Sequence, residues 1–376
     1  MENLSLLLER SCEDLCEDFH SLKTPRDVAA LLDVPYKRFV YHLYKEENRY
    51  TSFEIPKKSG DRRTISAPVI GLKIIQRKLS QVLYCVYNPK PSVHGFVPAK
   101  SILTNALPHV KKRYVLNADL KDFFPSINFG RVRGLFMAAP YGLSPEVATV
   151  LAQICCYEGK LPQGAPTSPV VSNMICARMD RQLQHLAKEY RSTYTRYADD
   201  ITFSTTVPKF PKALAYVPEE GDEKKLILGE KLAEIIISND FRVNEQKVRL
   251  QDKRSHQEVT GLTVNEFPNV DRRYVRSIRA ILHAWDKFGL QKAQEVYLEK
   301  YAPTPRYPQQ EKSSLKQVLH GKIEFLAMVR GKEDQIYQKH IKKYFELSQR
   351  DSIPHKAILV RQEAVHEQTG TSNDEV

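Results

Sequence analysis

The sequence predicts an α+β fold, in which antiparallel hairpins and amphipathic helices occur along the same chain. Two observations favour this class. Short apolar runs joined by tight turns are typical of β-hairpins, and longer segments repeat apolar residues at helical spacing. With 376 residues and a hydrophobic content of 41%, the chain is long enough to bury a substantial core and to form two or three subdomains.

The first part of the chain predicts short helices, then a hairpin and a longer helix. Within residues 1–50, a hydroxyl cap at Thr24 precedes proline at Pro25, which is a helix-start signal. Next, strands are predicted at 52–56 and 62–65, with a turn between them at 57–61. A helix is predicted at 70–87. The inward face of that helix is predicted to consist of Ile74, Ile75, Leu79, Val82 and Leu83.

The rest of the chain combines further strands with helices. Strand patterns occur at 114–120, 194–204, 242–244 and 258–264. Helical patterns occur between 121 and 157, after the loop at 159–166, near 223–238 and from Arg272 onward. A charged, proline-containing insertion at 207–222 is predicted to be a surface loop. The polar tail beyond residue 351 is predicted to be disordered.

Two adjacent carboxylates, Asp199 and Asp200, occupy the predicted tip of the 194–204 hairpin. Neighbouring residues on a regular strand point to opposite faces, so only a tight turn brings both carboxylates towards the same place. Asp-Asp pairs are also common in turns, where they bond their own backbone. The apolar strands around this pair predict burial, however, and buried like charges are costly unless a cation compensates them.

A third acid, Asp119, stands at the end of the apolar run 114–120. Three acids at two strand ends have the composition of a two-metal phosphoryl-transfer site. Magnesium ions prefer such hard oxygen ligands and hold the attacking and leaving oxygens in line. The sequence therefore predicts a metal-dependent site for phosphoryl transfer.

The net charge of +12 is unevenly distributed. Residues 51–118 contain 12 Lys and Arg against 2 acids, and residues 271–350 contain 17 against 9. Two basic blocks that flank an acidic centre are typical of a channel for a phosphate backbone, although a solvated charged surface is the alternative for either block alone. In the helix from Arg272, arginines 272, 276 and 279 form a stripe away from the apolar face and could meet such a backbone.

The six cysteines are scattered through apolar stretches and form no Cys-x-x-Cys pair, which predicts buried free thiols. The first residues lack the basic start and apolar core of a signal peptide, and no apolar run approaches membrane-spanning length. A cytoplasmic protein without a membrane partner is therefore expected.

The order and spacing of five motifs resemble those of reverse transcriptases. Three are similar to palm motifs: the strand ending in Asp119, Leu161-Pro162-Gln163-Gly164 with Ser168-Pro169, and Tyr197-Ala198-Asp199-Asp200. Two are similar to elements that mark bacterial retron reverse transcriptases: Asn105-Ala106-Leu107-Pro108-His109 and Val259-Thr260-Gly261. Each motif alone is a weak signal, whereas five in register over most of the chain are specific.

This resemblance implies a right-hand polymerase with fingers, an antiparallel-sheet palm and a helical thumb. The implied regions are an N-terminal helical region at 1–50, fingers at 51–115, a palm with finger-palm helices and the 207–222 insertion at 116–268, a thumb at 269–350 and a tail at 351–376. No ribonuclease H domain is evident, because the residues after 270 lack spaced acids on strands.

By the family pattern, Asp119, Asp199 and Asp200 are the catalytic acids, and together with Leu120 they hold two Mg²⁺ ions. Lys247 is either a proton donor to the leaving pyrophosphate or a solvated lysine.

The resemblance also implies a nucleotide-binding set: Lys58, Arg63, Phe124, Gln163 and Gly164. Strand alternation leaves open whether Lys57 or Lys58, and Arg62 or Arg63, points inward. Phe124 stands where the family has an aromatic gate that clashes with a ribonucleotide 2′-hydroxyl, and Phe123 is the competing candidate. Glycine at Gly164 would allow close backbone approach in the nucleotide pocket.

The residues implied in RNA handling are Asn105, His109, Val259, Thr260, Gly261, Arg272, Arg276 and Arg279. For Asn105 and His109, four residues apart, a structural hydrogen-bonded pair is the alternative.

A retron reverse transcriptase would copy part of a cognate structured noncoding RNA into multicopy single-stranded DNA, primed from the 2′-hydroxyl of an internal guanosine. Its implied partners are that RNA, the RNA–DNA product, deoxynucleoside triphosphates and an effector protein in defence against phage. The acidic N-terminal region and the 207–222 insertion are candidate surfaces for the effector. The alternatives are a template-independent phage-resistance polymerase and a catalytically idle RNA-binding scaffold.

Overall fold

The computed structural model describes residues 5–45, 48–56, 60, 62–218, 226–300 and 314–351. The chain divides into two compact units. The first comprises Met1–Thr260 with Val264–Phe267, and the second comprises Gly261–Thr263 with Pro268–Val376. The continuous part of the second unit starts at Pro268, and the thumb boundary at residue 269 stays a prediction.

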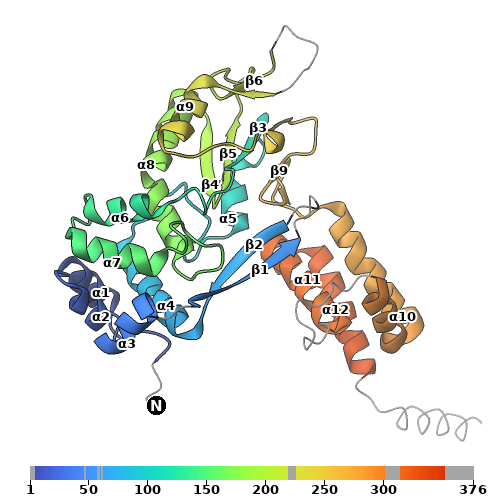
Figure 1. Ribbon diagram of the computed structural model, residues 1–376. Helices are drawn as coiled ribbons and strands as arrows, with labels where there is room; N and C mark the ends of the chain where they lie inside the picture. The colour runs from blue at the N-terminus through green and yellow to red at the C-terminus, as the bar shows by residue number, and fades with distance from the viewer. Residues whose placement is uncertain are drawn as a thin grey trace, which may run out of the picture. The chain divides into compact units, whose positions relative to one another are not determined.

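Three short helices open the first unit (Figure 1). They are α1 (Cys12–His20), α2 (Pro25–Leu31) and α3 (Tyr36–Val40), followed by a π-helical turn, η1 (Tyr41–Lys45). Thr24 caps α2 in a capping box with Asp27, and Pro25 occupies the first turn, so the predicted helix start is confirmed.

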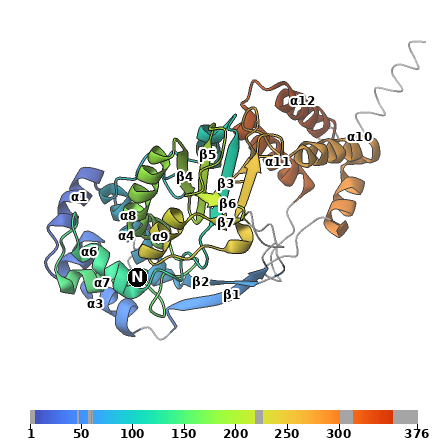
Figure 2. The ribbon, with the colours of Figure 1, turned by 90° about the horizontal axis from the view of Figure 1, so that it is seen from above.

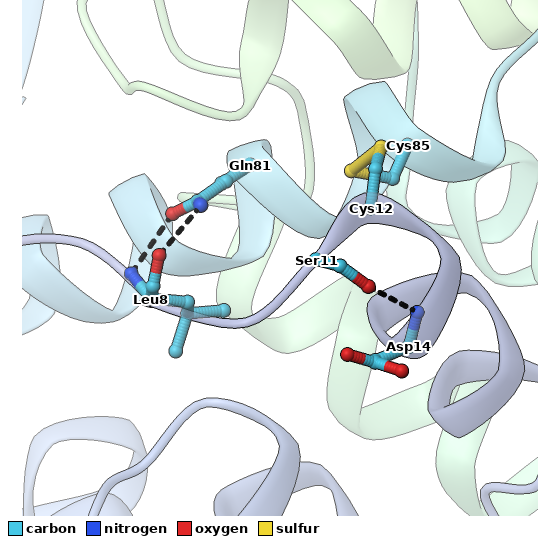
Figure 3. Close-up of a disulfide and its surroundings, with 6 residues drawn as sticks. All are labelled: Leu8, Ser11, Cys12, Asp14, Gln81 and Cys85. Carbon is cyan, nitrogen blue, oxygen red and sulfur yellow. Dashed lines mark hydrogen bonds between the residues drawn. A yellow bond between two sulfur atoms is a disulfide. The ribbon is translucent and has the colours of Figure 1, made fainter.

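A disulfide joins α1 to the long helix α4 (Ile70–Val86), as Figure 3 shows. It links Cys12 and Cys85, whose Cα atoms lie 5.3 Å apart, within the usual range for a disulfide. The side-chain amide of Gln81 adds two hydrogen bonds of 2.9 Å to the backbone of Leu8. The expectation of free thiols is therefore wrong for these two cysteines, because helix packing brings together residues that are 73 positions apart.

The predicted fingers hairpin is present as β1 (Tyr50–Pro56) and β2 (Arg62–Pro68), which pair antiparallel. Lys57 and Lys58, in its predicted turn, lie outside the described residues. The helix predicted at 70–87 is confirmed as α4. Of its predicted inward face, four residues are buried and Ile74 is partly exposed: the buried ones are Ile75, Leu79, Val82 and Leu83.

The centre of the first unit is a four-stranded antiparallel sheet in the order β4-β5-β3-β8. Its strands are β4 (Thr193–Tyr197), β5 (Asp200–Thr205), β3 (Tyr114–Asp119) and β8 (Arg249–Asp252). The strand predicted at 242–244 is wrong, because this segment forms only one bridge, between Leu120 and Val243. The true edge strand, β8, has a polar sequence, so its apolar pattern is too weak to predict it.

Helices cover this sheet and extend its core. The long helix α8 (Ser168–Glu189) lies beside β4 (Figure 2), and the other helices of this part are α5 (Ile102–Ala106), α6 (Phe129–Met137), α7 (Pro145–Cys155), α9 (Glu230–Ser238) and the 3-10 turns η2 (Leu107–His109) and η3 (Glu245–Lys247). Buried side chains from the N-terminal helices, α4, α7, α8 and the sheet form one continuous hydrophobic cluster. This packing holds the strands that carry the acids in one register.

The insertion predicted as a surface loop is partly anchored. It contains a small antiparallel pair, β6 (Ala215–Tyr216) and β7 (Ile227–Leu228), while residues 219–225 lie outside the described residues. Leu214 and Ala215 are buried, because their apolar side chains join the main core. The prediction of a surface loop is therefore wrong for this part of the insertion.

Two short strands, β9 (Glu258–Val259) and β10 (Leu262–Thr263), replace the single strand predicted at 258–264. Strand β9 belongs to the first unit and β10 to the second. The other described elements of the second unit are helices: α10 (Arg272–Lys300), α11 (Leu315–Arg330) and α12 (Gln335–Arg350). Glycine at Gly289 has φ +80° and breaks the regular geometry of α10. No helix of the described residues is both long and apolar enough to span a membrane.

The apolar face predicted for α10 is confirmed. Ile278 and Trp285 are fully buried, and Leu282 is nearly so. The indole Nε1 of Trp285 donates a 2.6 Å hydrogen bond to Asp351. Residues 301–313 and 352–376, which include almost all of the predicted tail, lie outside the described residues.

Candidate active site

The turn between β4 and β5 consists of two residues, Ala198 and Asp199. Tyr197 and Asp200 face each other as the last pair of the hairpin, so the tip predicted from the sequence is confirmed. Ala198 has φ +56°, a left-handed conformation that costs a residue with a Cβ about 1–2 kcal/mol. The turn that aims Asp199 is therefore held by contacts around it rather than by local preference.

Strand β3 brings Asp119 to the same edge of the sheet. Asp119 is the register partner of Asp200, and the backbone N–H of Leu120 donates a 3.0 Å hydrogen bond to the carbonyl of Asp199. Directly opposed residues of an antiparallel pair have Cβ atoms about 4.5–5.5 Å apart. Two paired strand ends thus place three carboxylates next to one another.

The carboxylates oppose each other's ionisation. Partial loss of hydration raises the pKa of Asp200 to about 7, and the charges of Asp199 and Asp119 add to this shift. Asp200 is nevertheless exposed and Asp199 half-buried, so the burial predicted for this pair is wrong for Asp200, which lies at the open end of the strand. Burial and the charge of Asp119 likewise raise the pKa of Asp199. Full ionisation of Asp199 and Asp200 at neutral pH therefore needs compensating positive charge.

One cation of the protein already balances part of this charge. The ammonium of Lys247, in η3, donates a 2.8 Å hydrogen bond to the Oδ2 atom of Asp119, and this bond raises the pKa of Lys247. Asp119 is 9% exposed, whereas the Lys247 side chain is 59% exposed. Asp199 and Asp200 form no ion pair within the described part of the chain.

The donor chemistry of this site fits magnesium, because the acids supply hard oxygen ligands with uncompensated charge. Leu120 has an aliphatic side chain and offers only its backbone carbonyl. Among the described residues, no three His, Cys, Asp or Glu side chains are gathered closely enough to form a complete metal site. The residues that could bind a cation are therefore adjacent, but their side chains do not converge on a common point.

The structure distinguishes the two arginines of β2. Arg62 is engaged with Glu54 across the hairpin, at 2.9 Å. The charge of Arg63 instead lowers the pKa of Asp199, against the larger effect of burial. Arg63 is therefore the arginine whose charge acts on the acidic site.

The two adjacent phenylalanines also differ. Phe123 is 3% exposed and stacks on Phe241 with ring centroids 5.7 Å apart, so it belongs to the core. Phe124 is only partly buried, and its ring centroid lies 6.0 Å from that of Phe96. Of the two, Phe124 keeps the surface that a sugar could contact.

The Gln163-Gly164 loop packs against the fingers hairpin. The carbonyl of Gln163 accepts a 2.8 Å hydrogen bond from Ser66 on β2. Gly164 has φ +121°, and a Cβ there would lie 2.9 Å from the carbonyl oxygen of Ser66 and from a methyl group of Ile65. The close approach expected at this glycine is thus to the backbone of β2.

Asn105 and His109 are buried, with 1% and 0% exposure. The ring of His109 hydrogen-bonds Ser204 Oγ at 2.6 Å through Nδ1 and Thr195 Oγ1 at 2.7 Å through Nε2. Burial lowers the pKa of His109 to about 3, so the ring is neutral. Direct RNA contact by these side chains is inconsistent with their burial; His109 instead ties η2 to both strands of the hairpin that carries Asp199 and Asp200.

The Val259-Thr260-Gly261 element runs from the interior to the surface, since Thr260 is half-buried and Gly261 is exposed. Val259 is fully buried, and Thr260 and Gly261 have φ +47° and +81°, respectively. The hydroxyl of Thr260 donates a 3.2 Å hydrogen bond to the carbonyl of Ile102 on α5. This element is therefore bonded to α5, the helix that carries Asn105.

The predicted arginine stripe lies on the surface of α10: Arg272, Arg276 and Arg279 are exposed. A role in RNA binding stays a prediction for these residues.

Sequence reasoning missed a buried ion pair behind the catalytic turn, formed by Asp180 on α8 and Arg196 on β4. Alternation along β4 was the available signal, since Arg196 lies two residues after the apolar Tyr194 and thus shares its face. The partner on α8 carries no comparable signal in the sequence.

Comparison with known proteins agrees with this geometry. Residues 55–264 match the family model described as reverse transcriptase (RNA-dependent DNA polymerase). A solved structure of telomerase from Candida albicans with a fragment of telomeric RNA is similar over 87% of this chain and 66% of that chain, at 9% identity and a TM-score of 0.43, which is too distant to bear on fold or function.

Three curated relatives are retron reverse transcriptases. The Mx65 enzyme of Myxococcus xanthus is 40% identical over 69% of this chain and 62% of its own length. The Mx162 enzyme of the same organism is 40% identical over 65% of this chain and 54% of its own length. The Ec86 enzyme of Escherichia coli is 35% identical over 64% of this chain and 71% of its own length. The match thus spans less than two thirds of the first two relatives.

The family model covers more than half of the chain, and its residues include the whole hairpin with Asp199 and Asp200 and the strand with Asp119. The α+β architecture with an antiparallel sheet is that of a right-hand polymerase. The chain belongs to the reverse transcriptase family and, within it, to the retron reverse transcriptases.

Proposed function

We propose that this protein is the RNA-directed DNA polymerase of a retron, a nucleotidyltransferase that copies part of a structured noncoding RNA into multicopy single-stranded DNA. The observation that carries the proposal is the meeting of Asp119, Asp199 and Asp200 at one edge of the sheet, with their charges only partly compensated. The names of its relatives, which are retron reverse transcriptases, support the choice of template and product.

Asp119, Asp199 and Asp200, with the backbone carbonyl of Leu120, are the groups that would hold Mg²⁺, two ions in the full proposal. When bound, magnesium lowers the pKa of an attacking hydroxyl and offsets negative charge on a triphosphate. The raised pKa values of Asp199 and Asp200 support this role, because a divalent cation favours the ionised form of both acids.

Lys247 has two roles in the proposal. In this structure it balances Asp119, at 2.8 Å. Once another cation takes over that balance, the exposed ammonium is free to donate a proton to the leaving pyrophosphate. Its hydrogen bond to Asp119 keeps the side chain protonated beside the site, as its raised pKa indicates.

Nucleotide selection is assigned to residues around the acids. Arg63 would grip the triphosphate, since it has the charge and the fork geometry for phosphate oxygens. Phe124 would exclude a 2′-hydroxyl, and Gln163 would line the pocket beside Gly164. Lys58, outside the described residues, remains part of this proposal by family pattern alone.

The RNA would be bound by exposed basic residues rather than by Asn105 and His109. Arg272, Arg276 and Arg279 are exposed on one helix and suit a phosphate backbone. Priming from an internal guanosine 2′-hydroxyl, an effector protein as partner and a role in defence against phage complete the proposal.

The test is to express the protein with its neighbouring genomic region and to sequence the nucleic acid that copurifies. The catalytic variant is Asp199→Asn with Asp200→Asn. The matched control is Asp122→Asn, because Asp122 is an exposed acid at φ +49°, where asparagine is well tolerated.

Short DNA joined to one structured RNA, present in the wild type and the control and absent from the catalytic variant, is the expected result. DNA unrelated in sequence to the RNA would support a template-independent polymerase instead. RNA alone in all three samples would support the binding scaffold and overturn the enzymatic proposal.

A further inference from the structure

Strand β4 carries a fully buried arginine one residue before the catalytic motif. Arg196 is 0% exposed, and so is Asp180 on α8. The Nε and Nη2 atoms of Arg196 donate hydrogen bonds of 2.7 and 2.8 Å to the two carboxylate oxygens of Asp180. The hydroxyl of Tyr194 donates a further 2.7 Å bond to Oδ1 of the same carboxylate. Each oxygen of Asp180 therefore has a donor.

The remaining terminal nitrogen of Arg196 points to the catalytic turn. Its Nη1 atom donates a 2.9 Å hydrogen bond to the carbonyl of Ala198. Ala198 is the left-handed residue that precedes Asp199. One guanidinium thus connects a rigid helix, α8, to the residue whose conformation directs Asp199 and Asp200.

The loop segment at 92–95 also contacts the turn, through one isolated bridge between Val93 and Arg196. Arg196 exchanges backbone hydrogen bonds of 2.8 Å with Ser92 and His94. A Cβ on Gly95 would lie 2.3 Å from the backbone nitrogen of Ala198, so this segment touches the turn directly. The carbonyl of Gly95 accepts a 2.8 Å bond from Asn173, which is also on α8.

We propose that Arg196 and Asp180 are positioning residues, which hold the Ala198 turn so that the carboxylates of Asp199 and Asp200 face a bound divalent cation. The proposal rests on the proposed function of those acids. A non-glycine residue with positive φ persists only where its surroundings over-determine it, and the Arg196 bond is such a constraint. Replacing a buried ion pair by apolar residues often leaves stability unchanged, so fold stability alone does not explain the pair.

The first test measures Mn²⁺ binding to the full chain by electron paramagnetic resonance, with no nucleotide present. Arg196→Lys keeps a positive charge but cannot reach both Asp180 and the Ala198 carbonyl. Outer groups that orient metal ligands typically change metal affinity by about 10- to 100-fold, and we expect a loss of this size. Tyr194→Phe is the matched control, because it removes a hydrogen bond from the same carboxylate and leaves the Arg196–Ala198 bond in place. Its Mn²⁺ affinity should stay within about twofold of the wild-type affinity, a smaller change than the loss expected for Arg196→Lys.

A second variant covers the case in which Arg196→Lys does not fold. The triple variant Asp180→Leu, Arg196→Met, Tyr194→Phe replaces the polar group by apolar side chains and should fold. It should nevertheless bind Mn²⁺ as weakly as Arg196→Lys. Primer extension on an RNA template should show a lower kcat in both, with the KM for deoxynucleotide nearly unchanged.

Wild-type Mn²⁺ affinity in a folded Arg196→Lys or triple variant overturns the positioning role. An equal loss of affinity in Tyr194→Phe also overturns it, because general disturbance of the core would then be the cause. Failure of the proposed function is distinguishable, since the wild type would then bind Mn²⁺ without extending a primer.

Discussion

The catalytic turn has carboxylates on both of its sides, and their charges are balanced differently. Behind the turn, Asp180 receives three hydrogen bonds from Arg196 and Tyr194. At the tip, Asp199 and Asp200 have no ion pair within the described residues, and the pKa of Asp200 is raised to about 7. The same protein thus pairs one buried carboxylate completely and leaves two neighbours with only the partial compensation of cations that do not pair with them. This contrast supports the proposal that the tip binds a cation from outside the chain.

Removal of one uncompensated acid should have the largest effect. Asp200→Asn should reduce primer extension about 1000-fold or more, since metal catalysis contributes several kcal/mol and each 1.36 kcal/mol is tenfold. Its thermal stability without metal should equal or exceed that of the wild type, because a repulsion is removed. Activity assays and thermal unfolding check both parts. A large loss of stability would show that Asp200 is structural, and Asp122→Asn should change neither quantity.

Magnesium should stabilise the protein only through the uncompensated acids. A ligand at 100 times its Kd stabilises the native state by about 2.7 kcal/mol, so the Tm should rise when Mg²⁺ is added to metal-free protein. The rise should disappear in Asp200→Asn and persist in Tyr194→Phe, which affects only the compensated carboxylate. Differential scanning calorimetry with and without EDTA measures this. An undiminished rise in Asp200→Asn would place the ion elsewhere.

The buried His109, which bonds both strands of the β4–β5 hairpin, provides a pH-dependent test of the interior. The folded state holds His109 neutral, with a pKa of about 3, whereas the unfolded chain takes up a proton below about pH 6.5. The stability that this shift contributes is present above pH 6.5 and is lost progressively as the pH falls towards 3. In urea unfolding between pH 7.5 and 5, His109→Gln should lose less stability on acidification than the wild type.

Substitution of an exposed histidine provides the control for that experiment. His185→Gln, on the surface of α8, should keep the wild-type pH dependence. An identical slope in the wild type and in His109→Gln would show that the ring is protonated in the folded state.

Substitution of the two arginines of β2 should have the smallest effects, which should appear in the KM for deoxynucleotide. Arg62 is balanced by Glu54, and Arg63 acts on Asp199. Arg63→Gln should raise the KM for deoxynucleotide about tenfold, as expected for loss of a charge-assisted hydrogen bond. Arg62→Gln should change it less than about threefold, as for an exposed ion pair. Steady-state kinetics of both variants measures these KM values. A larger effect of Arg62→Gln would assign triphosphate binding to Arg62 instead of Arg63.

Much of the fold could be predicted from local patterns. The hairpins at β1–β2 and β4–β5, the amphipathic helix α4 and the apolar face of α10 all follow from period-2 or helical spacing. The edge strand β8 could not be predicted in this way, because an edge strand buries little and carries a polar sequence. The Cys12–Cys85 disulfide was also missed, since it depends on how α1 packs on α4.

Local patterns in the sequence were enough to propose which residues carry the chemistry: adjacent acids in a hairpin turn, a third acid at a strand end and motifs in family order. Only the tertiary structure decided between neighbours such as Phe123 and Phe124, because burial depends on what packs against each side chain. It also removed Asn105 and His109 from the surface and revealed Arg196 bonded to both Asp180 and the catalytic turn. Charge compensation depends on distances between elements that are far apart in the chain, and local sequence does not contain those distances.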